Sequence, residues 1–297
     1  MRPWTEVPPQ PGRHFVVTGA NSGIGLEVAR ILGSRGARVT LACRSVERGE
    51  AAARKVPGHD TGRVVVRELD VSSLASVRAF ADRLVQEEGG LDVLVNNAGI
   101  LGVPFGLSED GIELHFATNH LGHFALTNLL LPHLRDRVVV TSSRNHRGAD
   151  LDLDDLAWER RKYGAFPAYG ASKLANLLFL DELQRRLEAA GSPVRAVGAH
   201  PGSTASHIAS TSAPRWAAPI VQWGHELVSM PGWRGALNTV YAATMDVPGG
   251  TYIGPHGRLE MHGWPSVARR SRAATDAVAA RRLWDVSEKL SGVSFPL

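Results

Sequence analysis

Short runs rich in β-branched and apolar residues alternate along this chain with longer segments of helical periodicity. Strands that alternate with helices of about ten to twenty residues form right-handed βαβ units and a parallel sheet. Near-continuous apolar runs such as VVVT and LDVLV are typical of strands buried on both faces. We therefore expect an α/β protein with a doubly wound sheet of about seven parallel strands and helices on both faces. The expected strands span 14–18, 38–42, 64–68, 91–95, 137–141, 194–199 and 251–253, and the expected helices span 23–34, 46–55, 73–88, 108–131, 169–190 and 234–245.

The chain is long enough for one large domain, and nothing in its sequence marks a boundary. Its 297 residues are 43% hydrophobic and 21% charged, which is ordinary for a globular protein with a substantial core. No linker, repeat or low-complexity tract divides it. We expect a single domain over 1–297, with its core at 11–203.

Charge and cysteine content exclude several classes of protein. The 33 basic and 29 acidic residues are mostly intermixed, and the one basic cluster, at 269–272, has no nucleic-acid motif around it, so no nucleic-acid partner is expected. Cys43 is the only cysteine, which excludes disulfides and cysteine-based metal sites. No signal-peptide core is visible and no apolar run approaches about 18 residues. The sequence predicts a cytoplasmic protein with no transmembrane segment.

A glycine-rich turn, TGANSGIG at 18–25, follows the first expected strand and opens a helix. Gly19, Gly23 and Gly25 allow a tight turn and a close approach of the backbone to a pyrophosphate. The helix N-terminus then supplies free N–H groups and the positive end of its dipole. A glycine turn can also serve close packing alone, but its place between strand and helix favours dinucleotide binding.

Tyr169 and Lys173 stand four residues apart in AYGASKLANLLFL, where a helix would place both side chains on one face. An ammonium beside a phenol favours the phenolate, so we expect the pKa of Tyr169 to be lowered. Such a Tyr can act as a general acid or base at neutral pH. Taken alone, the pair is more typical of a surface Tyr and a solvated Lys on an amphipathic helix.

Together with these two motifs, the segments LDV at 69–71, NNAG at 96–99, ATNHLGHF around Asn119, TSS at 141–143 and HPG at 200–202 resemble the short-chain dehydrogenase/reductase family. Their order covers nearly the whole chain. The long connection to Tyr169, with DDLAW and YGASKLANLLF, looks most like the retinol-dehydrogenase-like subgroup. The resemblance implies a Rossmann-like fold and hydride transfer between NADP(H) and a carbonyl or alcohol. A redox sensor that holds NADP without turnover is the alternative.

The resemblance also implies four catalytic residues. Tyr169 would give a proton to the carbonyl oxygen or take it from the alcohol, and Ser143 would hold that oxygen. Spacing alone does not choose between Ser142 and Ser143, although the family pattern favours Ser143. Lys173 matches the residue that contacts the ribose hydroxyls. Asn119 matches the residue whose side chain helps to hold a water in a proton relay.

The end of the second strand indicates which cofactor is used. An acidic residue there would bind the ribose hydroxyls and repel a 2′-phosphate. Cys43 occupies that position, and Arg44, which suits bidentate phosphate contact, follows it. Arg48 could add to this site, whereas Ser22 lacks the basic side chain of some NADP-dependent relatives. NADP(H) is therefore favoured over NAD(H). The full expected cofactor site is Gly19, Asn21, Ser22, Gly23, Ile24, Gly25, Arg44, Ser45, Asp70, Val71, Asn97, Ala98, Gly99, Tyr169, Lys173, Pro201, Gly202 and Thr204.

Residues 204–232 are rich in Ala, Ser, Pro and Trp, and part of this segment has helical apolar spacing. We expect it to form a lid over the reacting groups and the substrate to be largely apolar. A helix packed on the core, or against a second copy in a homodimer, is the alternative.

His120 and His123 lack a third ligand at matching spacing and are expected to be structural, so no metal is expected.

Overall fold

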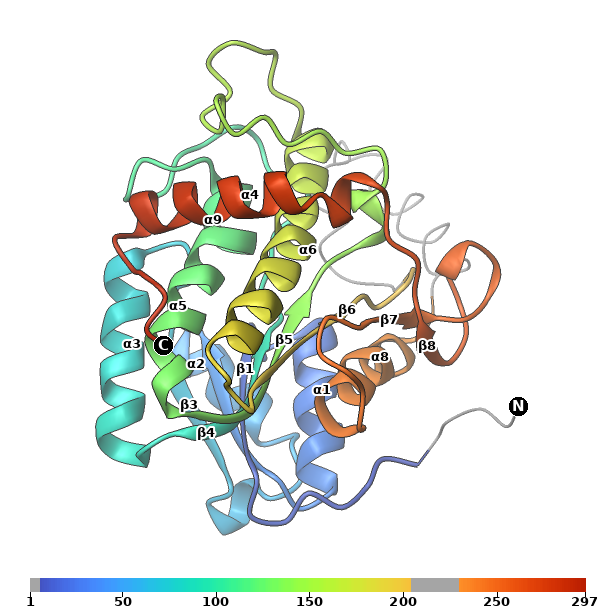
Figure 1. The fold of residues 1–297 in the computed structure, drawn as a ribbon. Helices are drawn as coiled ribbons and strands as arrows, with labels where there is room; N and C mark the ends of the chain where they lie inside the picture. Colours follow the sequence, from blue (N-terminus) through green and yellow to red (C-terminus); the bar gives the residue numbers. More distant parts are fainter. Residues whose placement is uncertain (1–5, 204–229) are drawn as a thin grey trace, which may run out of the picture.

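The computed structural model describes residues 6–203 and 230–297 of the chain. Eight strands form one sheet in the order β3-β2-β1-β4-β5-β6-β7-β8 (Figure 1). The first seven run parallel to their neighbours, and only β8, paired with β7, is antiparallel. This confirms the predicted Rossmann-like α/β class and adds a short edge strand that was not predicted. The strands are β1 His14–Thr18, β2 Arg38–Cys43, β3 Val64–Glu68, β4 Leu91–Asn96, β5 Leu134–Thr141, β6 Arg195–Ala199, β7 Tyr252–Pro255 and β8 Pro265–Val267.

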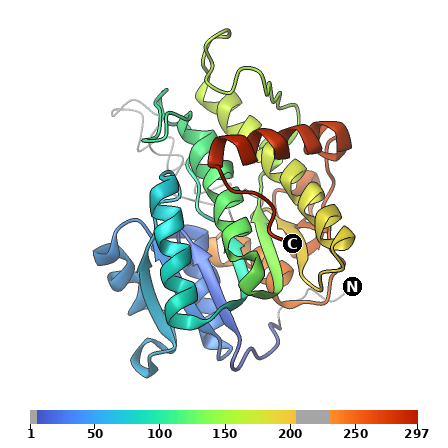
Figure 2. The same ribbon diagram turned by 60° about the vertical axis from the view of Figure 1, so that its left-hand side comes forward.

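Helices cover both faces of the sheet (Figure 2). α3, α5, α6 and α9 pack into one hydrophobic cluster, and α1, α2 and α8 pack into the other. β1 divides its side chains between them, because Val16 belongs to the first cluster and Phe15 and Val17 to the second. The helices are α1 Gly23–Ser34, α2 Val46–Ala53, α3 Leu74–Glu88, α4 Leu114–Phe116, α5 Gly122–Leu130, α6 Ala165–Ala189, α8 Gly232–Thr244 and α9 Ala277–Ser291.

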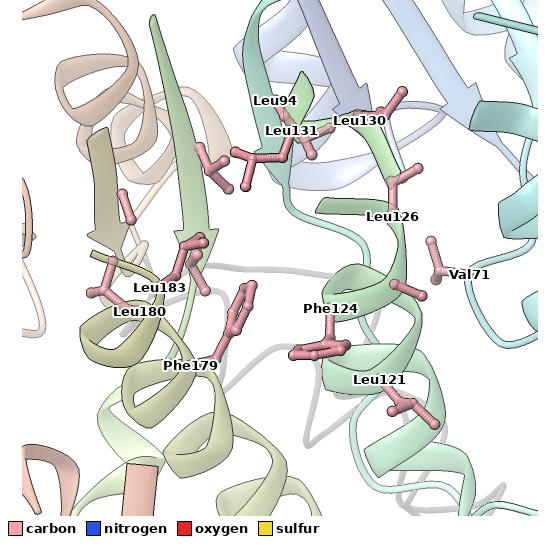
Figure 3. Packing of buried hydrophobic residues seen from close by; sticks show 14 of the residues in the cluster. Val71, Leu94, Leu121, Phe124, Leu126, Leu130, Leu131, Phe179, Leu180 and Leu183 are labelled. Carbon is pink, nitrogen blue, oxygen red and sulfur yellow. The ribbon is translucent and has the colours of Figure 1, made fainter. Parts of the chain in front are cut away.

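The larger cluster has an aromatic centre. Phe124 of α5 and Phe179 of α6 point toward each other across it (Figure 3). Their ring centroids are 5.6 Å apart, and Trp284 of α9 lies 4.9 Å from Phe124 and 5.7 Å from Phe179. α9 therefore packs on α5 and α6 through a fully buried indole.

Two predicted helix boundaries are wrong. The helix expected over 108–131 begins at Leu114, because Leu107 pairs with Glu113 in a β-bridge and the carboxylate of Glu113 caps the first turn. The helix expected from position 169 already begins at Ala165. Pro167 stands in its first turn, where the missing N–H costs no helical hydrogen bond.

The predicted lid falls almost wholly on 204–229, outside the described residues. Ser203 and Met230 are the described residues on either side of that gap. They are joined by a hydrogen bond of 2.8 Å from the Met230 N–H to the Ser203 carbonyl. None of the helices within 6–203 and 230–297 is both long and apolar enough to cross a membrane.

Candidate active site

A cavity of about 520 Å³ opens at the carboxyl ends of the parallel strands, where such sheets bind ligands. All expected cofactor residues from Gly19 to Gly202 line it, and so do Ser143, Tyr169 and Lys173. Asn119 lies behind the wall, and Thr204 is outside the described residues. The lining also includes residues to which the sequence assigned no role: Leu69, Thr118 and Thr141, which lie within quoted motifs, and Ile100, Leu101, Arg144, Asn145 and Ser203, which lie outside them.

The glycine turn forms one end of the cavity. Gly19 has a φ of 66°, and a Cβ there would lie 2.9 Å from the Cα of Ala98. A Cβ at Gly25 would lie 2.5 Å from the Asn97 amide nitrogen and 2.6 Å from the Gly19 carbonyl. Ser22 precedes α1 without a capping side-chain hydrogen bond, so the first N–H groups of the helix are free to bind an anion. The turn therefore fits a dinucleotide pyrophosphate.

Thr18 holds the next loop against this turn. Its hydroxyl accepts hydrogen bonds from the N–H groups of Asn97 and Ala98, each 2.9 Å long. The Asn97 side chain donates to the Thr18 carbonyl at 2.8 Å, and His123 Nε2 lies 2.9 Å from the Thr18 hydroxyl. The NNAG loop is thus positioned by β1 and α5 before any ligand arrives.

At the end of β2 the site presents cationic side chains and no acid. Cys43 is buried, which raises the pKa of its thiol to about 11 and keeps it neutral. Ser45 caps α2 by accepting from the Arg48 N–H. The side chain of Arg44 is 78% exposed, and its Nη1 lies 3.9 Å from Asp70 Oδ2, a distance that holds it only weakly.

Tyr169 and Lys173 of α6 share one wall of the cavity, with the Lys173 ammonium 5.7 Å from the centre of the Tyr169 ring. Burial raises the pKa of Tyr169, and a hydrogen bond with Ser143 partly opposes that rise. Burial also lowers the pKa of Lys173 to about 8, while its ammonium donates to the Thr141 carbonyl at 3.2 Å. The expected lowering of the Tyr169 pKa is therefore not produced by the chain's own groups, because desolvation outweighs the hydrogen bond with Ser143.

The two serines at the end of β5 have different surroundings. The Ser142 hydroxyl is buried and donates to the Lys173 carbonyl at 2.7 Å, so it is already engaged in packing. The Ser143 hydroxyl accepts from the Asn145 N–H at 3.2 Å and reaches the Tyr169 hydroxyl. The geometry therefore leaves Ser143 as the serine free to meet a substrate oxygen, which spacing alone could not decide.

Asn119 lies in a π-helical turn, Ala117–Leu121, that joins α4 to α5. Its amide nitrogen donates to the Ile100 carbonyl at 3.0 Å and to Ser172 at 2.9 Å, and its amide oxygen accepts from the Ile100 N–H at 2.8 Å. Its own carbonyl accepts from Asn176 at 3.0 Å. The side chain thus fixes the loop after β4, and the expected water-holding role stays a prediction.

His120 and His123 are buried and face different elements. His120 Nε2 lies 2.9 Å from the Ser287 hydroxyl of α9, whereas His123 contacts Thr18. Burial lowers their pKa values to about 3 and about 4, so both are neutral. Within the described ranges, no three His, Cys, Asp or Glu residues are grouped as a metal site would require.

A glycine-rich turn, a Tyr–Lys pair and a serine around one cavity define a nicotinamide-dependent oxidoreductase site. A family model described as short chain dehydrogenase matches residues 13–215. Human retinol dehydrogenase 13 is 39% identical, covering 96% of this chain and 86% of its own length. The crystal structure of an uncharacterized protein from Mycobacterium paratuberculosis is 47% identical with a TM-score of 0.84, covering 99% of this chain and 100% of that chain. A short chain dehydrogenase from Burkholderia cenocepacia in complex with NADP is 25% identical with a TM-score of 0.62, covering 82% and 95%.

The chain belongs to the short-chain dehydrogenase family and is retinol-dehydrogenase-like within it, as its motifs predicted. It is an oxidoreductase that acts on alcohol or carbonyl groups.

Proposed function

We propose that the chain transfers a hydride between NADP(H) and a carbonyl or alcohol substrate, with Tyr169 moving the proton. The observation that carries the proposal is the meeting of Tyr169, Ser143 and Lys173 in the wall of the cavity that the glycine turn closes. When bound, the nicotinamide supplies or accepts the hydride. Ser143 would hold the reacting oxygen beside the Tyr169 hydroxyl.

The raised pKa of Tyr169 keeps the phenol protonated at neutral pH, which suits proton donation during carbonyl reduction. Lys173, whose pKa of about 8 leaves much of its charge at that pH, would bind the ribose hydroxyls and supply the local positive charge. Asn119 would support both residues by fixing the Ile100 loop and, through Asn176, the α6 helix. In the alternative function, a redox sensor, the same residues would bind the cofactor but no substrate would be turned over.

Cofactor choice is proposed from the end of β2. Arg44 is exposed and only weakly paired, Arg48 lies beside it in the lining, and Cys43 brings no negative charge against a 2′-phosphate. The Burkholderia cenocepacia relative was solved with NADP, which supports the same choice here. Ile100 and Leu101 in the lining support an apolar portion in the substrate. The single domain over 1–297, the cytoplasmic location and the homodimer stay predictions.

The proposal is tested by a screen of carbonyls and alcohols with NADPH, NADH and their oxidised forms, following nicotinamide absorbance. Tyr169→Phe should lower turnover by roughly 10²- to 10⁴-fold while NADPH still binds. Tyr241→Phe on α8, outside the cavity lining, is the matched control and should keep near-native turnover. Tight NADPH binding without turnover of any compound would favour the sensor, and a fully active Tyr169→Phe would remove Tyr169 from the mechanism.

A further inference from the structure

Arg144 is a cation in the cavity wall that no described residue neutralises. It directly follows Ser143, at the start of the short 3₁₀ turn Arg144–His146, and it lines the cavity. The side chain is half-buried, and its Nε is shielded from solvent with no hydrogen-bond partner. Throughout 6–203 and 230–297, no carboxylate pairs with its guanidinium.

Glu260, the acid beside His200, is already bound by other groups. Glu260 Oε2 accepts from Arg147 at 2.6 Å and lies 3.3 Å from His200 Nε2, while its Oε1 accepts from the Arg269 N–H at 2.9 Å. His200 is close enough to Arg144 that the guanidinium, after burial and together with Arg147, helps to lower the histidine pKa. Among the described residues, none therefore offsets the positive charge of Arg144 at the cavity wall.

The position of Arg144 separates it from the other lining arginines. Arg44 and Arg48 stand at the end of β2, where the adenosine phosphate is proposed to bind. Arg144 is instead covalently next to Ser143, the residue proposed to hold the reacting oxygen. A ligand group that reaches Arg144 therefore belongs to the substrate end of the cavity.

A partly desolvated guanidinium without a partner is costly, and an anion in the cavity would remove that cost. Arginine binds carboxylate and phosphate oxygens through two parallel N–H bonds, a geometry that a point charge such as Lys does not offer. Asn145, the next lining residue, places an exposed amide side chain beside it.

We propose that Arg144 selects carbonyl or alcohol substrates that carry an oxyanion group, a carboxylate or a phosphate, near the reacting carbon. The inference rests on the proposed function and narrows its substrate class. Ile100 and Leu101 would contact the apolar part of such a molecule, and Arg144 would bind its charged end. The substrate is then amphipathic, in place of the largely apolar one that the 204–232 segment suggested.

Three aldehydes with one ring test the proposal: 4-formylbenzoate, 4-formylphenyl phosphate and the neutral methyl 4-formylbenzoate. The kcat/KM for at least one of the two anionic aldehydes should exceed that for the ester by roughly 10-fold or more. The anionic aldehyde with the higher kcat/KM identifies the preferred oxyanion. Arg144→Gln should lower that anion-to-ester ratio by roughly 10- to 100-fold, mainly through KM, and Arg144→Lys should restore part of it. A ratio near one in the native enzyme, or a ratio unchanged in Arg144→Gln, would overturn the proposal and leave the proposed function intact.

Arg44→Gln is the matched control, because it should weaken NADPH binding without changing the anion-to-ester ratio. A binding measurement makes the test independent of turnover. Calorimetry with benzoate, and in parallel with phenyl phosphate, should show binding to the native protein in the presence of NADP⁺ and weaker binding to both Arg144 variants. If no aldehyde is reduced, the proposed function fails on these compounds while calorimetry still decides the role of Arg144. Equal binding of each anion to native and variant proteins would exclude that role.

Discussion

Alanine substitutions at Ser142 and Ser143 should separate a role in packing from a role in the reaction. The Ser143 hydroxyl contacts Tyr169 and otherwise accepts only from the Asn145 N–H at 3.2 Å, in an exposed turn. Ser143→Ala should therefore cost little stability. Removing one donor to a developing oxyanion lowers kcat by roughly 10²- to 10³-fold, or about 2.7–4 kcal/mol. Ser142→Ala instead removes the buried 2.7 Å bond to the Lys173 carbonyl, worth about 1 kcal/mol of unfolding free energy and a Tm decrease of about 2 °C.

The assay pairs kcat, on a carbonyl found by the screen, with thermal unfolding followed by circular dichroism. We expect Ser143→Ala to lose turnover and keep its Tm. Ser142→Ala should lower the Tm by about 2 °C and keep most of its turnover, because Lys173 remains held by its bond to Thr141. A Ser142→Ala variant as inactive as Ser143→Ala, or a Ser143→Ala variant within about threefold of native kcat, would refute the assignment.

Three further outcomes follow from contacts in the structure. Arg44→Gln should weaken NADPH by roughly 10- to 100-fold and NADH much less, since only NADPH carries the 2′-phosphate, and fluorescence titration checks this. Burial lowers the pKa of Lys173 from 10.5 to about 8, so the unfolded chain binds more protons than the folded protein between those values. Stability relative to Lys173→Met should therefore rise with pH from about 8 to 10.5, measured by urea unfolding. Trp284→Ala, which removes the indole that packs against both Phe124 and Phe179, should cost about 3–5 kcal/mol in the same assay.

The parallel sheet was predictable because each buried strand carries its own apolar run, and each run is separated from the next by a helix-length segment. β8 could not be found this way, since it has three residues, none buried, and depends on pairing with β7. α9, which was not predicted, does carry helix signals in the sequence. Asp276 caps its first turn and Gly292 ends it in the left-handed conformation, the usual marks of a helix start and stop.

The backbone parts of the site were predictable for a similar reason. The glycine turn requires particular conformations at fixed positions, and the Tyr–Lys spacing follows from the helix itself. What sequence could not supply was the direction and solvation of individual side chains. Ser142 and Ser143 differ only because β5 turns one hydroxyl toward α6 and the other toward the cavity. The pKa of Tyr169 is set by desolvation, which depends on tertiary packing.

The charge of the cavity shows the same dependence on packing. Among its described lining residues, Asp70 is the only acid, and Arg44, Arg48, Arg144 and Lys173 supply the positive charge. Along the sequence Arg44 and Arg48 already indicated a phosphate site, whereas Arg144 gave no sign of one. The fold places two arginines at the β2 end and one beside Ser143. Under the two proposals, the first pair would bind the 2′-phosphate of the cofactor and Arg144 the oxyanion of the substrate. A concave site with this charge attracts both through long-range electrostatics. On this reasoning, the residue after Ser143 determines which carbonyl compounds remain bound long enough to react.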